Sequence, residues 1–357
     1  MNESNKQTAE LLLAHFQRYP LAQIPDLLKL LFQQEFGCGH FVSDEEKNLA
    51  RLRKEFSDLS CTSREEAVEP IGNDFARLHL RVLSQTSLRM STLSRLFTLS
   101  ANQAAGSKEG FLKKAGILRA LCQEGRLPFP DSQVDLFLTQ WETDGGGPFS
   151  HTEAFRQAYG PAYRVISRRF CRFLPLFSRI DQLLKSHPHV AIAIDGDSGA
   201  GKSTLAGLLK EVYDCQVVHM DHFFLRPGQR TRDRLQEAGG NIDYERFSET
   251  VLPHLGTSVP ITYRPFDCQT GQLGAEIRLE PKRLTVVEGV YSHHPLFEDA
   301  YHLKIFFFVD EAQQLGRIFA RNGERMLNRF KDEWIPMEKH YFDTFAIKEN
   351  SELAFHT

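Results

Sequence analysis

The chain has few of the features that mark secreted, membrane or nucleic-acid-binding proteins. Its six cysteines are scattered at positions 38, 61, 122, 171, 215 and 268 without a CxxC pair, which argues against a disulfide framework or a zinc knuckle. The first residues, MNESNKQTAE, lack the layout of a secretory signal, and no apolar run approaches the roughly 18 residues of a membrane helix. The net charge of −3 gives no basic excess for nucleic acid. We therefore expect a cytoplasmic protein that binds neither membranes nor nucleic acid.

The composition that remains is that of a globular protein with sizeable cores, 41% apolar and 25% charged. A length of 357 residues predicts two domains. In the first half, apolar residues recur at helical spacing in 9–16, 24–36, 88–99 and 111–121. Ser43 and Glu46 form a predicted capping box ahead of a further helix. The first domain, residues 1–185, is therefore predicted to be mostly helical.

The end of this first domain contains a loop and a predicted long helix. The segment 144–148, DGGGP, has the composition of a loop. Pro161 is then expected near the first turn of a helix that passes through Tyr163 and ends close to Leu184. The short segment SHPH that follows leads to the second domain, which we place at residues 186–357.

The second domain changes character. Short apolar runs at 190–194, 216–220, 284–287 and 305–309 alternate with helical stretches. Continuous apolar strands that alternate with helices are typical of a parallel sheet buried on both faces. The fold class is therefore predicted to be an α/β nucleotide-binding domain preceded by a mostly helical domain.

The segment 196–204, GDSGAGKST, follows the first of these strands directly and opens a helix. This is the phosphate-binding pattern G-x-x-x-x-G-K-[ST] in its strand–loop–helix setting, and a chance glycine-rich turn is the weaker alternative. Glycines allow the backbone N–H groups to wrap a phosphate, the lysine reaches the outer phosphates and the serine binds Mg²⁺. The predicted ATP-binding residues are Gly196, Asp197, Ser198, Gly199, Ala200, Gly201, Lys202, Ser203 and Thr204.

Two acidic residues follow other predicted strands. Asp221 comes after the run 216–220, and a carboxylate at the carboxyl end of a parallel strand projects into the ligand crevice. It is a candidate base for an acceptor hydroxyl, with a helix cap or turn as the alternative. Glu288 ends the strand 284–287, and an acid at this place in a phosphate-loop protein reaches Mg²⁺ or its water shell. Gly289, next in the chain, suggests a close backbone approach.

Four arginines follow the last apolar run. Arg317, Arg321, Arg325 and Arg329 are spaced four apart, which predicts a stripe along one helical face. A solvated charged face is the general alternative for such a run. Its position after a sheet strand favours a lid that supplies cations to the migrating phosphoryl group, with Arg317 and Arg321 as the catalytic members.

The ordered set of segments resembles uridine kinase and its relatives phosphoribulokinase and bacterial-type pantothenate kinase. GDSGAGKST is followed by MDHFF, NIDYERF, ITYRPFD, VVEGVY and the arginine-rich lid, across about residues 189–350. The resemblance implies that Asp221 accepts the proton of a sugar 5′-hydroxyl and that Asp243 holds ribose hydroxyls. It also implies that Tyr263 and Phe266 help form the base pocket, and that Glu288 organises Mg²⁺.

Three departures from the uridine-kinase pattern bear on the acceptor. Phe224 stands where that family has a tyrosine, Asp267 begins a segment without the expected histidine, and Asn322 replaces an aspartate in the lid. The predicted function is therefore ATP- and Mg²⁺-dependent phosphoryl transfer to a small-molecule hydroxyl, with the 5′-hydroxyl of a nucleoside favoured and pantothenate or a sugar phosphate as the alternative acceptor. A nucleotide switch or regulatory ATPase, read out by the helical domain, is the alternative from another class. The absence of an N-K-x-D string disfavours a guanine-specific GTPase.

The helical domain has no recognised relative. Cys38, His40 and His151 are candidate metal ligands, but without a second close ligand pair structural roles are favoured for them. The domain is expected to serve regulation, self-association into a homo-oligomer, or substrate delivery.

Overall fold

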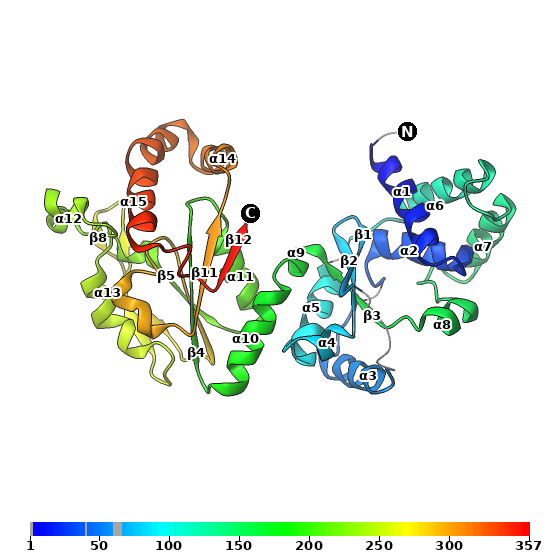
Figure 1. The fold of residues 1–357 in the computed structure, drawn as a ribbon, viewed down its shortest axis with the longest axis horizontal. Helices are drawn as coiled ribbons and strands as arrows, with labels where there is room; N and C mark the ends of the chain where they lie inside the picture. Colours follow the sequence, from blue (N-terminus) through cyan, green and yellow to red (C-terminus); the bar gives the residue numbers. More distant parts are fainter. Residues whose placement is uncertain (1–2, 40, 60–65, 104) are drawn as a thin grey trace. The chain divides into compact units, whose positions relative to one another are not determined.

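The computed structural model describes residues 3–39, 41–59, 66–103 and 105–357. The chain forms two compact units, residues 1–181 and 182–357, and the division falls within helix α10 (Leu174–Ser186). Figure 1 shows the helix-rich first unit in blue to green and the second in green to red. Within the described residues, no helix is long and apolar enough to cross a bilayer.

The first unit is mostly helical and contains one small sheet. Apolar faces of its helices pack around a core that includes Leu12, Leu27, Phe111 and Leu118. Strands β1, β2 and β3 pair in that order and are antiparallel. Its elements are α1 (Glu3–Arg18), α2 (Ile24–Phe36), α3 (Glu45–Ser57), β1 (Val68–Gly72), β2 (Phe75–His79), α4 (Val82–Gln85), α5 (Met90–Gln103), α6 (Lys108–Gln123), α7 (Asp131–Thr143), α8 (Glu153–Tyr159), β3 (Tyr163–Ser167), α9 (Arg168–Cys171) and the first part of α10.

Two local predictions for this unit were wrong. The long helix expected from Pro161 is instead strand β3 followed by α9 and α10, because β2 offers a paired edge that outweighs the helical spacing of the apolar residues. Gly160, in the left-handed conformation, ends α8 just before this strand. The cap of α3 is Asp44, not Ser43, since the Asp44 carboxylate accepts the Lys47 N–H at 2.8 Å.

The second unit is built on a five-stranded parallel sheet, as predicted. The strand order is β12-β11-β4-β10-β5, and β4 at its centre is buried at every residue. The edge strand β12 was not anticipated. The sheet strands are β4 (Val190–Gly196), β5 (Gln216–His219), β10 (Leu284–Glu288), β11 (Leu303–Phe308) and β12 (Leu353–His356). Two further antiparallel sheets have two strands each, β6 (Ile261–Tyr263) with β9 (Ile277–Leu279) and β7 (Phe266–Asp267) with β8 (Gln272–Leu273).

Helices flank this sheet, and α11 packs against β4, β5 and β10. Figure 1 shows α14 following the carboxyl end of β11, with α15 beside it. The α-helices are α11 (Lys202–Tyr213), α12 (Arg232–Gln236), α13 (Tyr244–Thr250), α14 (Glu311–Arg329) and α15 (Ile335–Phe345). Shorter turns are η1 (Met220–Phe223), η2 (Pro227–Gln229), η3 (Leu252–His254), η4 (Pro295–Ala300) and the π-helical η5 (Phe330–Trp334).

The register of the sheet places the carboxyl ends of β4, β5 and β10 next to one another. Glu288 on β10 lies opposite Ile194 on β4 and opposite His219 on β5. Because the strands are parallel, the segments that leave β4, β5 and β10 start at the same edge. These segments are the glycine-rich loop, the turn that contains Asp221, and the turn after Glu288.

Gly196, which begins the glycine-rich loop, allows a test of how closely β4 packs against β11. Gly196 has a φ of +132°, and a Cβ there would lie 1.9 Å from the carbonyl oxygen of Phe307. We expect Gly196→Ala to lower the free energy of unfolding of the second unit by about 2–5 kcal/mol. Gly207→Ala, in open space on α11, should raise it by ~0.5–1 kcal/mol. Denaturant titration of both variants checks this, and an unperturbed Gly196→Ala would contradict the close packing of β4 on β11.

Candidate functional site

The loop between β4 and α11 forms a cradle of backbone donors. Gly199 and Gly201 have φ angles of 78° and 96°, which turn the chain sharply into the helix. Within the described part of the chain, no acceptor receives the backbone N–H groups of Gly199, Gly201, Lys202, Ser203 or Thr204. Unpaired N–H groups at a helix N-terminus, with the helix dipole behind them, bind anions. The predicted phosphate loop therefore has the geometry that an anionic phosphate requires.

The Lys202 side chain is folded back onto this loop. Its Nζ donates to the carbonyl oxygens of Gly196 at 2.7 Å and Asp197 at 2.9 Å, and the residue is buried. The Asp197 carboxylate accepts the Val309 N–H at 3.0 Å, which anchors the loop to β11. Burial raises the pKa of Asp197. The lysine ammonium is thus held at the loop by neutral carbonyl groups, which a phosphate would replace with a charged partner.

Glu338, on α15, is a site residue that sequence reasoning missed. Its carboxylate accepts the Ser198 N–H at 3.2 Å and the Ser198 hydroxyl at 2.5 Å. One helical turn later, the Tyr341 hydroxyl donates to the buried Asp195 at 3.0 Å, at the end of β4. Burial raises the pKa of Glu338 to about 7. The only sequence signal was a glutamate and a tyrosine spaced i, i+3, which gives no hint of a contact with a loop so distant in the chain.

Ser203 and Glu288 lie together as predicted for a cation site. The Ser203 hydroxyl donates to the Glu288 carboxylate oxygens at 3.0 and 3.2 Å, and Nδ1 of His219 lies 2.5 Å from Oε1 of Glu288. This hydrogen bond raises the pKa of His219. The described residues contain no group of three or more His, Cys, Asp or Glu side chains able to hold a metal. A hydroxyl and one carboxylate nevertheless fit Mg²⁺, which keeps several waters and takes further oxygens from phosphates.

Asp221 lies in η1, directly after β5. The residue is exposed, yet the protein atoms crowded around its carboxyl partly desolvate it and raise its pKa, with Glu288 adding to this effect. Lys202 and Arg321 act in the opposite direction, which places both cations within electrostatic reach. Lys202, Glu288 and Arg321 therefore act electrostatically on Asp221.

The predicted stripe of four arginines is wrong. Gly323, with φ 77° and ψ 174°, interrupts α14 between Arg321 and Arg325, so no single helical face carries all four side chains. Beyond the break, Arg329 pairs with Glu333 at 3.0 Å. The prediction from the four-residue spacing was wrong because it assumed that one uninterrupted helix carries all four arginines.

The two arginines before the break face the site. Arg317 Nη1 donates to the carbonyl oxygen of Gly199 at 3.3 Å. Arg321 donates from Nε to its neighbour Asn322 at 2.7 Å and acts electrostatically on Asp221. The first half of α14 therefore lies over the loop.

The residues predicted to hold the acceptor are Asp243, Tyr263 and Phe266, which we call the acceptor wall. They lie on elements next to η1. Asp243 is buried, caps α13 by accepting the Arg246 N–H at 3.2 Å, and also accepts Nε–H of Arg246 at 3.2 Å. The Tyr263 hydroxyl lies 3.0 Å from Nδ1 of His222, the residue after Asp221. Tyr263 and Phe266 are both buried. Their buried positions give this wall a fixed shape.

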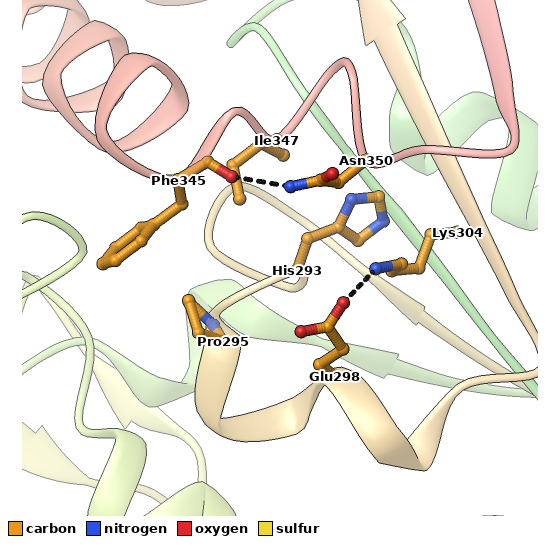
Figure 2. Close-up of a pocket in the computed structure, with 7 residues that line it drawn as sticks. All are labelled: His293, Pro295, Glu298, Lys304, Phe345, Ile347 and Asn350. Carbon is orange, nitrogen blue, oxygen red and sulfur yellow. Dashed lines mark hydrogen bonds and ion pairs between the residues drawn. The ribbon is translucent and has the colours of Figure 1, made fainter.

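A separate small pocket, partly open to solvent, lies away from these residues (Figure 2). It is lined by His293, Glu298, Lys304 and Asn350, among others, and by none of the predicted site residues. Lys304 pairs with Glu298 at 2.9 Å, and the Asn350 amide donates to a backbone carbonyl, as Figure 2 shows. Because these polar groups already have partners, this cavity offers little for catalysis.

Comparison with known proteins finds only distant likeness. No model of a known protein family matches the chain, and no curated protein matches its sequence. A structure described as a possible uridine kinase from Bacillus stearothermophilus is 19% identical, covers 51% of this chain and 100% of its own, and has a TM-score of 0.38. The YGR205w protein is 16% identical over 53% and 92% of the two chains, with a TM-score of 0.38. Similarity at this level does not identify a family, and the fold assignment rests on the strand order and loop described above.

The buried Glu338 carboxyl should make stability depend on pH. Its pKa lies near 7 in the folded chain and near 4.5 in the unfolded chain, so the folded chain binds more protons between these values. The free energy of unfolding should therefore fall, by on the order of 2–3 kcal/mol, as pH rises from 4.5 to 7. Glu338→Gln should remove this slope, because its side chain stays neutral.

Urea titration of the second unit across this pH window measures the effect. Asp343→Asn, an exposed substitution on the same helix, serves as the matched control and should keep the wild-type slope. An unchanged slope in Glu338→Gln would show that this carboxyl titrates normally.

Proposed function

We propose that the second unit is an ATP- and Mg²⁺-dependent kinase that transfers a phosphoryl group to a hydroxyl of a small molecule. The observation that carries the proposal is the meeting of four features at one sheet edge: the unpaired N–H cradle, Lys202, the Ser203–Glu288 pair and Asp221. A nucleotide switch also needs the N–H cradle, Lys202 and the Ser203–Glu288 pair. It does not need a carboxylate such as Asp221 to take a proton from a phosphoryl acceptor. The favoured acceptor is the 5′-hydroxyl of a nucleoside such as uridine or cytidine.

Each residue has a distinct task in this mechanism. The loop N–H groups and Lys202 bind the triphosphate, and Ser203 and Glu288 would hold Mg²⁺, which neutralises phosphate charge when bound. Asp221 accepts the proton of the acceptor hydroxyl. The hydroxyl oxygen bonds to the terminal phosphorus of ATP as ADP leaves. A raised pKa makes this carboxylate a stronger base. Arg317 and Arg321 supply positive charge over the migrating group.

The nucleoside assignment is supported by the acceptor wall beside η1. A carboxylate such as Asp243 binds two ribose hydroxyls through charge-assisted hydrogen bonds. Arg246 already pairs with this carboxylate, so its orientation is set before an acceptor arrives. Pantothenate and sugar phosphates remain the alternative acceptors, because Phe224 and Asp267 depart from the uridine-kinase pattern.

Substitution of the base tests the kinase assignment. Asp221→Asn keeps the shape of the side chain but removes the proton acceptor, and we expect kcat to fall by ~10²–10⁴ with nearly unchanged ATP binding. Lys202→Ala should abolish transfer and leave the fold intact. Asp233→Asn, an exposed change on α12, should have no effect. Transfer from labelled ATP to nucleosides, pantothenate and sugar phosphates provides the measurement, and ATP binding without transfer to any of them would favour the switch.

A second substitution tests the nucleoside assignment. Asp243→Asn preserves the helix cap but loses the charge that strengthens bonds to ribose hydroxyls, so the acceptor KM should rise while the KM for ATP stays unchanged. Glu249→Gln, exposed on the same helix, should match the wild type. Uridine and cytidine should outperform their 2′-deoxy forms. If pantothenate or a sugar phosphate accepts phosphate and no ribonucleoside does, the nucleoside assignment fails and the kinase assignment survives.

A further inference from the structure

Two peptide groups of the glycine-rich loop are free on their N–H side and held on their carbonyl side. Within the part of the chain that the structure describes, the N–H groups of Gly199 and Gly201 have no acceptor. The carbonyl oxygens of the same two peptide groups belong to Ser198 and Ala200, and each accepts a hydrogen bond from a side chain outside the loop. These two side chains therefore bear on the direction of the free N–H groups.

Gln314, on α14, holds the first of these carbonyl groups. Its Nε2 donates to the carbonyl oxygen of Ser198 at 3.0 Å. The side chain has little freedom to move, because Gln314 is only 4% exposed. Ser198 is also bound by α15, since its N–H and its hydroxyl both donate to the carboxylate of Glu338. Side chains of two helices thus fix the position of this one loop residue.

Thr357, which follows β12, holds the second carbonyl group. Its hydroxyl donates to the carbonyl oxygen of Ala200 at 2.8 Å. The same hydroxyl accepts a hydrogen bond from Nη1 of Arg317 at 3.1 Å, so its own hydrogen is left for the loop. The Thr357 N–H donates to the carbonyl oxygen of Phe308 on β11 at 2.9 Å, which anchors the residue to the sheet.

The peptide group that lies between these two is bonded on both sides. Its N–H, on Ala200, donates to the carbonyl oxygen of Asp197 at 3.1 Å. Its carbonyl oxygen, on Gly199, accepts from Nη1 of Arg317 at 3.3 Å. Because its N–H is already used inside the loop, this peptide group offers no donor to a phosphate. The free donors are therefore those of the two peptide groups that flank it.

The planarity of the peptide group links each carbonyl bond to an N–H direction. In a planar trans peptide group, the carbonyl oxygen and the N–H of the next residue point in opposite directions. The described residues contain no cis peptide bond. A donor that fixes the Ser198 carbonyl group therefore also fixes the direction of the Gly199 N–H. The donor to the Ala200 carbonyl group fixes the Gly201 N–H in the same way.

Such support from outside the loop is needed because glycine leaves the backbone free to turn. Gly199 and Gly201 both have positive φ angles, and neither has a side chain that would restrict the chain. We propose that Gln314 and Thr357 are positioning residues for ATP, each of which orients one glycine N–H toward the phosphates. Donors that are oriented in advance lose less conformational entropy when the ligand binds. This inference rests on the proposed function, which makes ATP the ligand of the loop.

Isothermal titration calorimetry of Mg²⁺–ATP into the full-length protein tests this role. Gln314→Leu keeps the size of the buried side chain but removes the donor, and Thr357→Val does the same at the second position. We expect the Kd for ATP to rise by about two- to tenfold in each variant, as for the loss of one hydrogen bond. Gln236→Leu, the same exchange at an exposed position on α12, should bind as the wild type does.

Two further measurements separate positioning from a purely structural role. In both variants the KM for ATP should rise while the KM for the phosphoryl acceptor stays unchanged. Gln314→Glu should bind ATP weakly at alkaline pH and regain affinity as the pH falls, because only a protonated carboxyl group can donate to the Ser198 carbonyl. Each value is taken relative to the wild type at the same pH, which corrects for the titration of Glu338. A side chain that only filled space would show no such recovery.

The outcomes distinguish this inference from the proposed function. Urea titration establishes that each variant is folded, and Thr357→Val, at a half-buried position, decides the matter if Gln314→Leu does not fold. ATP binding by the wild type with an unchanged Kd in the folded variants overturns the inference and leaves the proposed function intact. Absence of ATP binding by the wild type overturns the proposed function, and the inference falls with it.

Discussion

A single buried carboxylate at the end of β4 fixes the frame on which the candidate site of the second unit depends. Asp195 accepts hydrogen bonds from the N–H groups of Gly196 and His293 and from the hydroxyl of Tyr341. These three donors come from the glycine-rich loop, the turn after β10 and helix α15. Because the carboxylate is fully buried, losing any one donor would leave a charge poorly satisfied in a low dielectric. The phosphate loop, the turn after β10 and α15 are therefore positioned by the same group.

The acidic groups around the phosphate loop of the second unit lie in a poorly solvated environment. Around the loop of the second unit, burial raises the pKa values of Asp197, Asp221 and Glu338, so the carboxyl groups there resist ionisation. A divalent cation bound nearby would relieve this strain. A magnesium–nucleotide complex, the ligand proposed for this site, would supply such a cation.

Sequence patterns predicted the elements whose structure depends on neighbouring residues in the chain. They failed for elements and contacts that depend on residues far away in the chain. Apolar runs located the strands β4, β5, β10 and β11, of which β4 and β10 are buried at every residue. The segment Tyr163–Ser167 was misassigned because the helical spacing of its apolar residues said nothing of the strand edge it would join. The contact of Glu338 with Ser198 carries no local signal, since the two residues lie 140 positions apart in the chain.

The interruption of α14 at Gly323 bears on where the sequence can gain or lose residues during evolution. Before the break, Arg317 contacts the loop, and after it Phe330 packs in a cluster that includes Ile318 of the first half. A glycine in the left-handed region already breaks the helical hydrogen-bond pattern, so residues inserted or deleted there would not shift the register of either segment. Gly323 thus marks a point where residues can be inserted or deleted while Arg317 keeps its place over the loop and Glu338 of α15 keeps its contact with Ser198.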